Sequence, residues 1–244
     1  ECPSFLGIIE NQGEAISAMA HKHGAQSIVG VDPISLGILK PPADYAADIV
    51  VGTTQTLGVH MNTGGGVGGF IASRDEEKYV REYNTLNISI TDTQNEGEFG
   101  FGLSCAHQTS YGMREEAKDW TGNSTYLWAI AGAIYMSLLG PQGFREVGSL
   151  IIQQAHYAAK LLAGLPGVSV TFPKGFFKEI VVNFDDTGKN VDAINTALRA
   201  RGIFGGKDIS REFPTLGQSA LYSITEVHTK DDIEQLTEAL EEVL

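Results

Sequence analysis

The feature that most constrains the fold is the alternation of helical patterns with short β-branched runs in the first half of the chain. Residues 14–23 carry apolar side chains at helical spacing and stop at Gly24. The runs 27–31 and 48–52 are typical of buried strands, and 70–72 predicts a third strand. This alternation favours an α/β fold with a mostly parallel sheet. Because an average sheet has roughly 5–6 strands, we expect the chain to begin within a domain.

The second half has a different pattern. Residues 126–139 predict a helix that is apolar on nearly all sides and therefore buried, and 143–163 predict an amphipathic helix. Further strand and helix patterns follow at 168–172, 179–184, 191–201, 220–224 and 229–243. In the last of these, Thr229 and Asp232 have the spacing of a capping box. We therefore predict an α/β domain over 1–140 and a small α+β domain with an antiparallel sheet over 141–244.

Charge and cysteine content exclude several functions. The chain has 17 Lys+Arg against 30 Asp+Glu, a net charge of −13, so we expect no nucleic-acid partner. Cys2 and Cys105 cannot form a disulfide framework, and the six histidines lack metal-ligand spacing, so no metal site is predicted. The longest apolar run, 126–139, is shorter than the roughly 20 residues of a membrane helix. With no pattern of a signal peptide, we expect a soluble, cytoplasmic protein.

Two features could hold a small ligand. The glycine cluster 64–69 lies between strands and lacks the helix N-terminus that phosphate-binding motifs require, so a tightly packed connection is the favoured interpretation. Asp32 follows a predicted parallel strand, where open α/β sheets bind ligands. Its carboxylate could pair with a protonated ring nitrogen or a ribose. The pair Asp32-Pro33 could equally start a turn or helix.

Longer strings carry more information. The most specific one is DPISLGILKPP at residues 32–42. It is accompanied, in order, by PSFLG at 3–7, QTLG at 55–58, LLGPQG at 138–143, FFKE at 176–179 and GIFGG at 202–206. Together these strings resemble one family over essentially the whole chain: subunit 1 of glycine dehydrogenase (decarboxylating), the P protein of the glycine cleavage system.

The resemblance implies a fold-type-I architecture of the kind that uses pyridoxal phosphate (PLP), with part of the large domain in 1–140 and the small domain in 141–244. It also implies decarboxylation of glycine and transfer of the aminomethyl group to the lipoyl group of the H protein. This chemistry needs a lysine Schiff base and PLP as an electron sink. The implied partners are subunit 2 and the H protein, in an oligomer.

The same resemblance assigns roles to three residues. In the catalytic partner subunit a His-Lys pair precedes the glycine loop, and Thr54 and Gln55 stand at those positions here. The chain therefore resembles the subunit without the Schiff-base lysine, and we expect no catalytic residue on it and PLP on the partner. Asp32 corresponds to the aspartate that holds the pyridine nitrogen. Asp32, Thr54 and Gln55 are thus expected to form a vestigial cofactor site.

Two departures from the family pattern leave an alternative open. Ser110 stands where the family's Q-x-R-E-Q-H segment has arginine, and 118–123 also differ. A hydroxyl cannot replace a guanidinium that grips an anion through two hydrogen bonds. Family members are also longer at the N-terminus, so we expect a fragment or truncated paralogue with exposed apolar surface. The alternative is a divergent, non-catalytic scaffold or binding subunit. Another fold-type-I enzyme, such as a desulfurase-like one, is disfavoured by the missing lysine.

Overall fold

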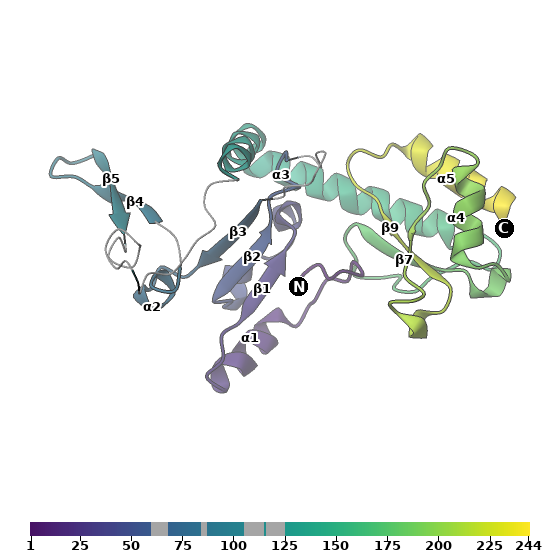
Figure 1. The fold of residues 1–244 in the computed structure, drawn as a ribbon, viewed down its shortest axis with the longest axis horizontal. Helices are drawn as coiled ribbons and strands as arrows, with labels where there is room; N and C mark the ends of the chain where they lie inside the picture. Colours follow the sequence, from purple (N-terminus) through teal and green to yellow (C-terminus); the bar gives the residue numbers. More distant parts are fainter. Residues whose placement is uncertain (60–67, 84–86, 105–114, 116–124) are drawn as a thin grey trace.

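A three-stranded sheet lies at the centre of the first half of the chain (Figure 1). The computed structural model describes residues 1–59, 68–83, 87–104, 115 and 125–244. The elements of this half, in chain order, are α1 (Gly13–Lys22), β1 (Ile28–Val31), η1 (Pro33–Gly37), η2 (Pro42–Tyr45), β2 (Ile49–Thr53) and β3 (Gly69–Ser73). Strand β2 pairs with β1 in parallel and with β3 in antiparallel orientation. The three predicted strands are therefore confirmed, and the parallel pairing described is that of β1 with β2.

A two-stranded hairpin stands apart from this sheet (Figure 1). The short helix α2 (Glu77–Val80) precedes it, and β4 (Asn87–Asp92) pairs antiparallel with β5 (Phe99–Ser104). Ile90 lies opposite Phe101, and both side chains are exposed. Two features of the sequence lie largely outside the described residues. They are the glycine cluster 64–69 and the segment 106–123, with Ser110, that differs from the family pattern.

The long helix α3 (Tyr126–Leu162) connects the two halves of the molecule. The sequence predicts two helices here, and the structure has two helical segments that meet at a kink. Gly140 is non-helical there, with φ 61° and ψ 178°, and Pro141 follows it. The predicted domain boundary between 140 and 141 coincides with this kink. Because α3 continues to Leu162 on the other side of the kink, the boundary stays a prediction.

The prediction that residues 126–139 are buried on all sides is wrong. One stripe of this helix packs inward: Gly132 lies against Leu57, and the Tyr135 ring makes an edge-on contact with Phe144. The opposite stripe is exposed, with Leu127 at 80% and Leu138 at 82%. An apolar sequence indicates which faces favour burial, but it does not place a covering element over them.

The C-terminal part is a four-stranded antiparallel sheet covered by helices. Its order is β6-β7-β9-β8, formed by β6 (Ser169–Val170), β7 (Glu179–Asn183), β8 (Lys207–Asp208) and β9 (Ser219–Ser223). The helices are α4 (Val191–Arg199) and α5 (Lys230–Val243), with the C-terminal half of α3, and the short turns η4 (Asp185–Thr187) and η5 (Pro214–Leu216) complete it. Buried Leu162, Ile180, Leu198 and Leu240 share its core. The capping box of Thr229 and Asp232 is confirmed.

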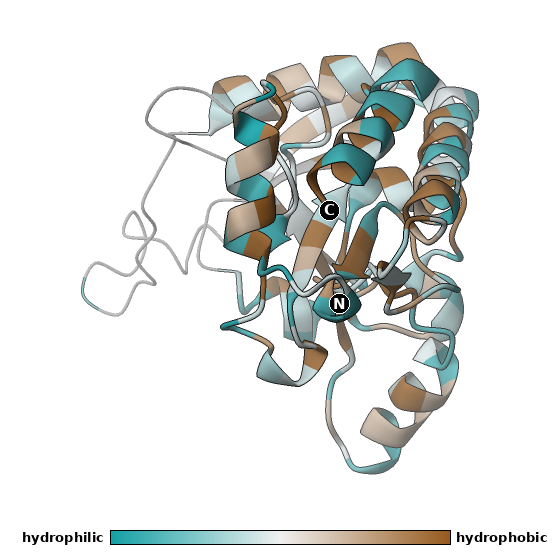
Figure 2. Cartoon of the chain, turned by 90° about the vertical axis from the view of Figure 1, so that its right-hand side faces the viewer, coloured by the Kyte–Doolittle hydropathy of each residue, from teal (hydrophilic) through white to brown (hydrophobic). Residues whose placement is uncertain are grey.

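These helices are amphipathic. Around the C-terminus, Figure 2 shows hydrophilic and hydrophobic stretches alternating along each helix. Such alternation is expected where one stripe faces a sheet and the other faces water.

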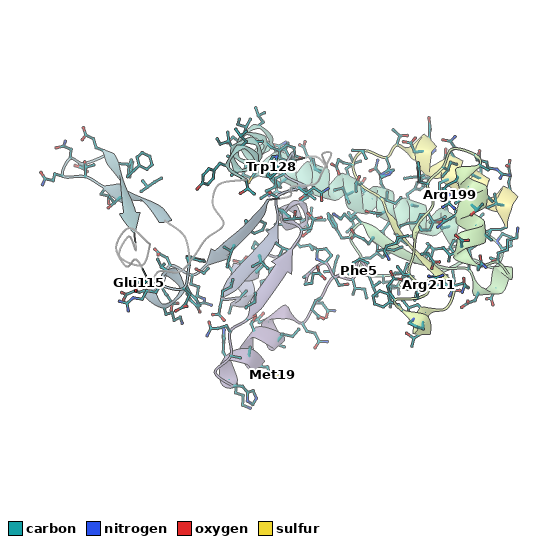
Figure 3. All side chains as sticks on the ribbon, viewed as in Figure 1. Phe5, Met19, Glu115, Trp128, Arg199 and Arg211 are labelled. Carbon is teal, nitrogen blue, oxygen red and sulfur yellow. The ribbon has the colours of Figure 1, made fainter. Side chains whose placement is uncertain are left out.

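The N-terminal segment bridges the two parts. Cys2 pairs with Val31 at the end of β1, and Ile8 pairs with Phe176 beside β7. The Phe5 ring, labelled in Figure 3, stacks on Phe213 of the C-terminal part with ring centroids 6.0 Å apart. The segment therefore holds the end of β1 close to the start of β7.

Within the described residues, no helix is both long and apolar enough to cross a membrane. The same part of the chain holds no group of three or more His, Cys, Asp or Glu placed to bind a metal ion.

Candidate functional site

Asp32 lies directly after β1 and caps the 3-10 helix η1. Its Oδ1 atom accepts a hydrogen bond from the backbone N–H of Ile34 at 3.0 Å and one from the Thr56 hydroxyl at 3.3 Å. Pro33 follows at the first helical position, where a missing N–H is harmless. The interpretation of Asp32-Pro33 as a helix start is confirmed, and the same capping places the carboxylate at the end of the parallel strands.

The charge partner of Asp32 comes from the other half of the molecule. Lys178, immediately before β7, donates to Oδ2 of Asp32 with an Nζ–Oδ2 distance of 2.5 Å. The lysine side chain is 18% exposed and the aspartate 13%. Burial alone would lower the pKa of the Lys178 ammonium, but the charge and hydrogen bond of Asp32 outweigh burial and raise this pKa above 10.5. Lys178 is therefore a protonated partner of Asp32.

Glu179 is the third charged group of the cluster. Its Oε1 atom lies 3.8 Å from Nζ of Lys178, beyond hydrogen-bond distance. Burial raises the pKa of Glu179 to about 7; the Lys178 ammonium opposes this rise, and the Asp32 carboxylate adds to it. The cluster thus combines an aspartate in a short ion pair with a glutamate that changes charge near neutral pH.

These groups line a cavity of about 630 Å³ between the first sheet and β7. Gln55, which follows β2, lines the cavity together with Asp32 and Lys178. Phe5 from the bridging N-terminal segment lies at its wall. The structure therefore brings together Asp32 and Gln55, two of the three residues predicted from the sequence.

Thr54 belongs to a different cavity. It lines a space of about 710 Å³ with Phe70, Met136 and Arg145, between β3 and α3. Its hydroxyl oxygen is buried, with no hydrogen-bond partner among the described residues. The structure does not place Thr54 with Asp32 and Gln55 around one space.

The residues of the Asp32 cavity do not fit PLP. Such a cofactor needs a lysine for the Schiff base and a free acidic partner for its ring nitrogen. Gln55 offers no amine, and the two lysines at the cavity are both ion-paired, Lys178 with Asp32 and Lys207 with Glu212 at 2.6 Å. The buried polar atoms left without a partner in the described chain all belong to residues outside this cavity lining.

Sequence reasoning missed Lys178 and Glu179 as site residues, although both stand in the string FFKE. The available signal is a charged pair placed directly after Phe176 and Phe177, which are both fully buried. Charged side chains at the edge of a core rarely lie there without partners.

The comparisons with known proteins agree with one another. The family model described as glycine cleavage system P-protein matches residues 1–240. A protein of Staphylothermus marinus named "Probable glycine dehydrogenase (decarboxylating) subunit 1" is 37% identical over 244 residues, which are 100% of this chain and 52% of the relative. One of the same name from Desulfitobacterium hafniense is 38% identical over 243 residues, 100% of this chain and 53% of the relative.

Solved structures give the same result. The crystal structure of glycine decarboxylase (P-protein) in inhibitor-bound form has a TM-score of 0.87 and 38% identity, over 100% of this chain and 54% of that one. A NifS-like protein from Rickettsia africae has a TM-score of 0.63 at 16% identity, over 98% of this chain and 58% of that one, and shows the fold alone. The fold is therefore that of fold-type-I PLP-dependent enzymes, as predicted. The chain spans about half the length of the curated relatives it matches.

Proposed function

Because the chain belongs to the glycine cleavage system P-protein family, we propose that it serves as a subunit of glycine dehydrogenase (decarboxylating). In this proposal it acts with subunit 2 in decarboxylating glycine and in passing the aminomethyl group to the lipoyl group of the H protein. The assembly is an oligomer in the cytoplasm. The chain itself contributes structure and neighbouring surface, and no catalytic residue.

One observation supports the structural role most strongly. Gln55 and Asp32 line the same cavity at the edge of the parallel strands, and the Asp32 carboxylate is already neutralised by Lys178. A Schiff base requires a lysine amine that can lose its proton. Since Gln55 has no amine and Lys178 is held protonated, PLP is assigned to the partner subunit, where it would act as the electron sink for the decarboxylation.

The test is carbon exchange between glycine and bicarbonate. The purified chain is mixed with subunit 2, PLP and H protein, and the control is the same mixture without the chain. The full-length subunit 1 relative from Staphylothermus marinus, assayed with its own subunit 2, is the positive control. Exchange that rises only when the chain is added supports the proposal. No rise, with complex formation verified, contradicts the glycine role and favours the non-catalytic scaffold.

A second readout separates structure from catalysis. After borohydride reduction of the active mixture, peptide mapping locates any lysine that carries reduced PLP. We expect the adduct on subunit 2 alone. An adduct at Lys178 or Lys207 of this chain would contradict its assignment as the subunit without a Schiff base.

A further inference from the structure

We propose that Lys178 is a specificity-determining residue: its ammonium occupies the Asp32 carboxylate, excludes a protonated pyridine ring from the cavity and joins the two halves of the chain instead. This inference rests on the proposed function, because it explains how a P-protein subunit closes its cavity to the cofactor of its partner.

The hydrogen bonds of Asp32 leave little room for a ring nitrogen. Oδ1 already accepts from Ile34 and Thr56, and Oδ2 accepts from Lys178. A pyridinium N–H is a single cationic donor, and it would have to approach the same carboxylate beside the lysine ammonium. Two cations in contact with one partly buried carboxylate repel each other, so the second is disfavoured.

Lys178 is held in place by the backbone around it. Its carbonyl accepts a hydrogen bond from Ile224 at 2.9 Å, and the preceding Phe177 donates to the carbonyl of Gly7 at 3.1 Å. Phe177 itself is fully buried. The backbone on both sides of Lys178 is therefore fixed at the edge of the cavity, and the side chain reaches Asp32 from this fixed position.

The ion pair also has a geometric consequence. Asp32 follows β1 of the first sheet, whereas Lys178 precedes β7 of the C-terminal sheet. The pair therefore links the two sheets at the wall of the cavity. In this chain the Asp32 carboxylate is therefore bound by Lys178 of the other half of the molecule, and not by a ligand.

The test measures binding of pyridoxine 5′-phosphate, which has the pyridine ring and phosphate of PLP but no aldehyde. It cannot form adducts with surface lysines, so a saturable change in its fluorescence reports non-covalent binding. The unmodified chain and Lys178→Arg keep a cation on Asp32, and Lys207→Gln is the matched control for a cavity lysine that is paired with Glu212 instead. We expect no saturable binding by these three.

Lys178→Gln removes the competing charge. We expect its affinity for pyridoxine 5′-phosphate to rise by about tenfold or more, and we expect Asp32→Asn added to it to abolish the gain. Binding by the unmodified chain as tight as by Lys178→Gln would overturn the inference. A folded Lys178→Gln variant with no gain would overturn it equally, because another group would then exclude the ring.

A measurement on the unmodified chain covers the case in which Lys178→Gln does not fold. Acetic anhydride modifies lysines through their neutral, accessible amines, and peptide mapping gives the rate at each position. Lys178 should react about tenfold or more slowly than exposed Lys174. Equal rates would show a free amine at Lys178 and overturn the inference. If the chain does not raise carbon exchange but the binding and acetylation results are as expected, only the proposed role in glycine decarboxylation is contradicted. The failure of one proposal can therefore be distinguished from the failure of the other.

Discussion

Gly7 and Glu179 are packed backbone to backbone, with no space for a side chain between them. A Cβ atom on Gly7 would overlap with the carbonyl oxygen of Glu179. Gly7 also has a φ of +84°, which L-residues rarely adopt. This contact sets how the N-terminal segment approaches β7, and hence the wall of the cavity that contains Lys178.

Gly7→Ala should destabilise the chain by about 3 kcal/mol or more, because backbone strain adds to a clash with backbone atoms that cannot move aside. Gly24→Ala is the matched control. Gly24 has a similar φ of +70°, but no described atom lies within 4 Å of its added Cβ, so only about 1 kcal/mol of strain is expected. Urea unfolding gives both values. Equal losses in the two variants would show that the contact with Glu179 is unimportant.

The raised pKa of Glu179 predicts a dependence of stability on pH. Its folded pKa of about 7 lies above the ordinary value of 4.5, so the folded state binds a proton that the unfolded state has released. Between these two values, each unit of rising pH should lower the free energy of unfolding by about 1.4 kcal/mol through this group. The contribution is present at low pH and is lost as pH rises through 7.

Glu179→Gln removes this group and leaves the other nearby charges, those of Lys178, Asp32 and Glu1, in place. The variant should be more stable than the unmodified chain at pH 8, by on the order of 2 to 3 kcal/mol, and about equal to it at pH 4.5. The measurement is the difference in free energy of unfolding across this range. A constant difference at all pH values would mean that Glu179 does not change charge near neutrality.

The local patterns of the sequence predicted the first sheet and one side of the site. Strands β1 and β2 coincide with β-branched runs, and the end of a parallel strand is a general ligand position. Asp32 after such a run is therefore a candidate, although these residues alone favour a turn or helix start. The resemblance to the family identified Gln55 as a second residue of the site, and it lines the same cavity as Asp32. These predictions depend on a few neighbouring residues or on a family pattern, and both kinds of information are present in the sequence.

The partner of Asp32 could not be predicted in this way. Lys178 is 146 positions away, and its contact depends on how the N-terminal segment and α3 hold the two sheets together. The same limit applies to Thr54. It adjoins Gln55 in the chain, but both residues lie beyond the end of β2, and the structure places them at different cavities.

A buried carboxylate at the start of β2 is expected to be important for stability. Asp48 accepts a hydrogen bond from the Ser27 N–H at 2.8 Å and one from the Tyr79 hydroxyl at 3.1 Å, and Nε2 of His21 lies 2.7 Å from its Oδ2. Burial alone would raise the pKa of Asp48, but these hydrogen bonds outweigh burial and hold the pKa below 3.8. Its stabilising contribution is therefore present above about pH 4 and is lost on further acidification.

Asp48→Ala should lower the free energy of unfolding at pH 7 by about 3 kcal/mol, because it leaves the buried Ser27 N–H without an acceptor and removes the carboxylate that pairs with His21 and Arg74. His21→Ala is the control: its side chain is 37% exposed, so its loss should cost about 1 kcal/mol or less. Denaturant unfolding at pH 7 compares the two. A loss in Asp48→Ala no larger than in His21→Ala would contradict this account of the site.

The exposed stripe of α3 predicts self-association of the isolated chain. Leu127, Ile130, Ile134 and Leu138 follow one another at helical spacing and are all exposed. A contiguous apolar stripe of this kind binds apolar dyes and favours association. Leu127→Lys combined with Leu138→Lys should reduce dye fluorescence and shift light scattering towards the monomer, with stability within about 0.5 kcal/mol of the unmodified chain.

Tyr135→Lys is the opposite control, because Tyr135 lies on the inward stripe against Phe144. It should lower the free energy of unfolding by about 2 kcal/mol or more, since a charge would enter a packed contact, and it should increase dye binding. If the double lysine variant destabilised the chain as much as Tyr135→Lys, the outer stripe would have to be packed against another part of the chain in solution. An unmodified chain that is monomeric and binds no dye would contradict the prediction directly.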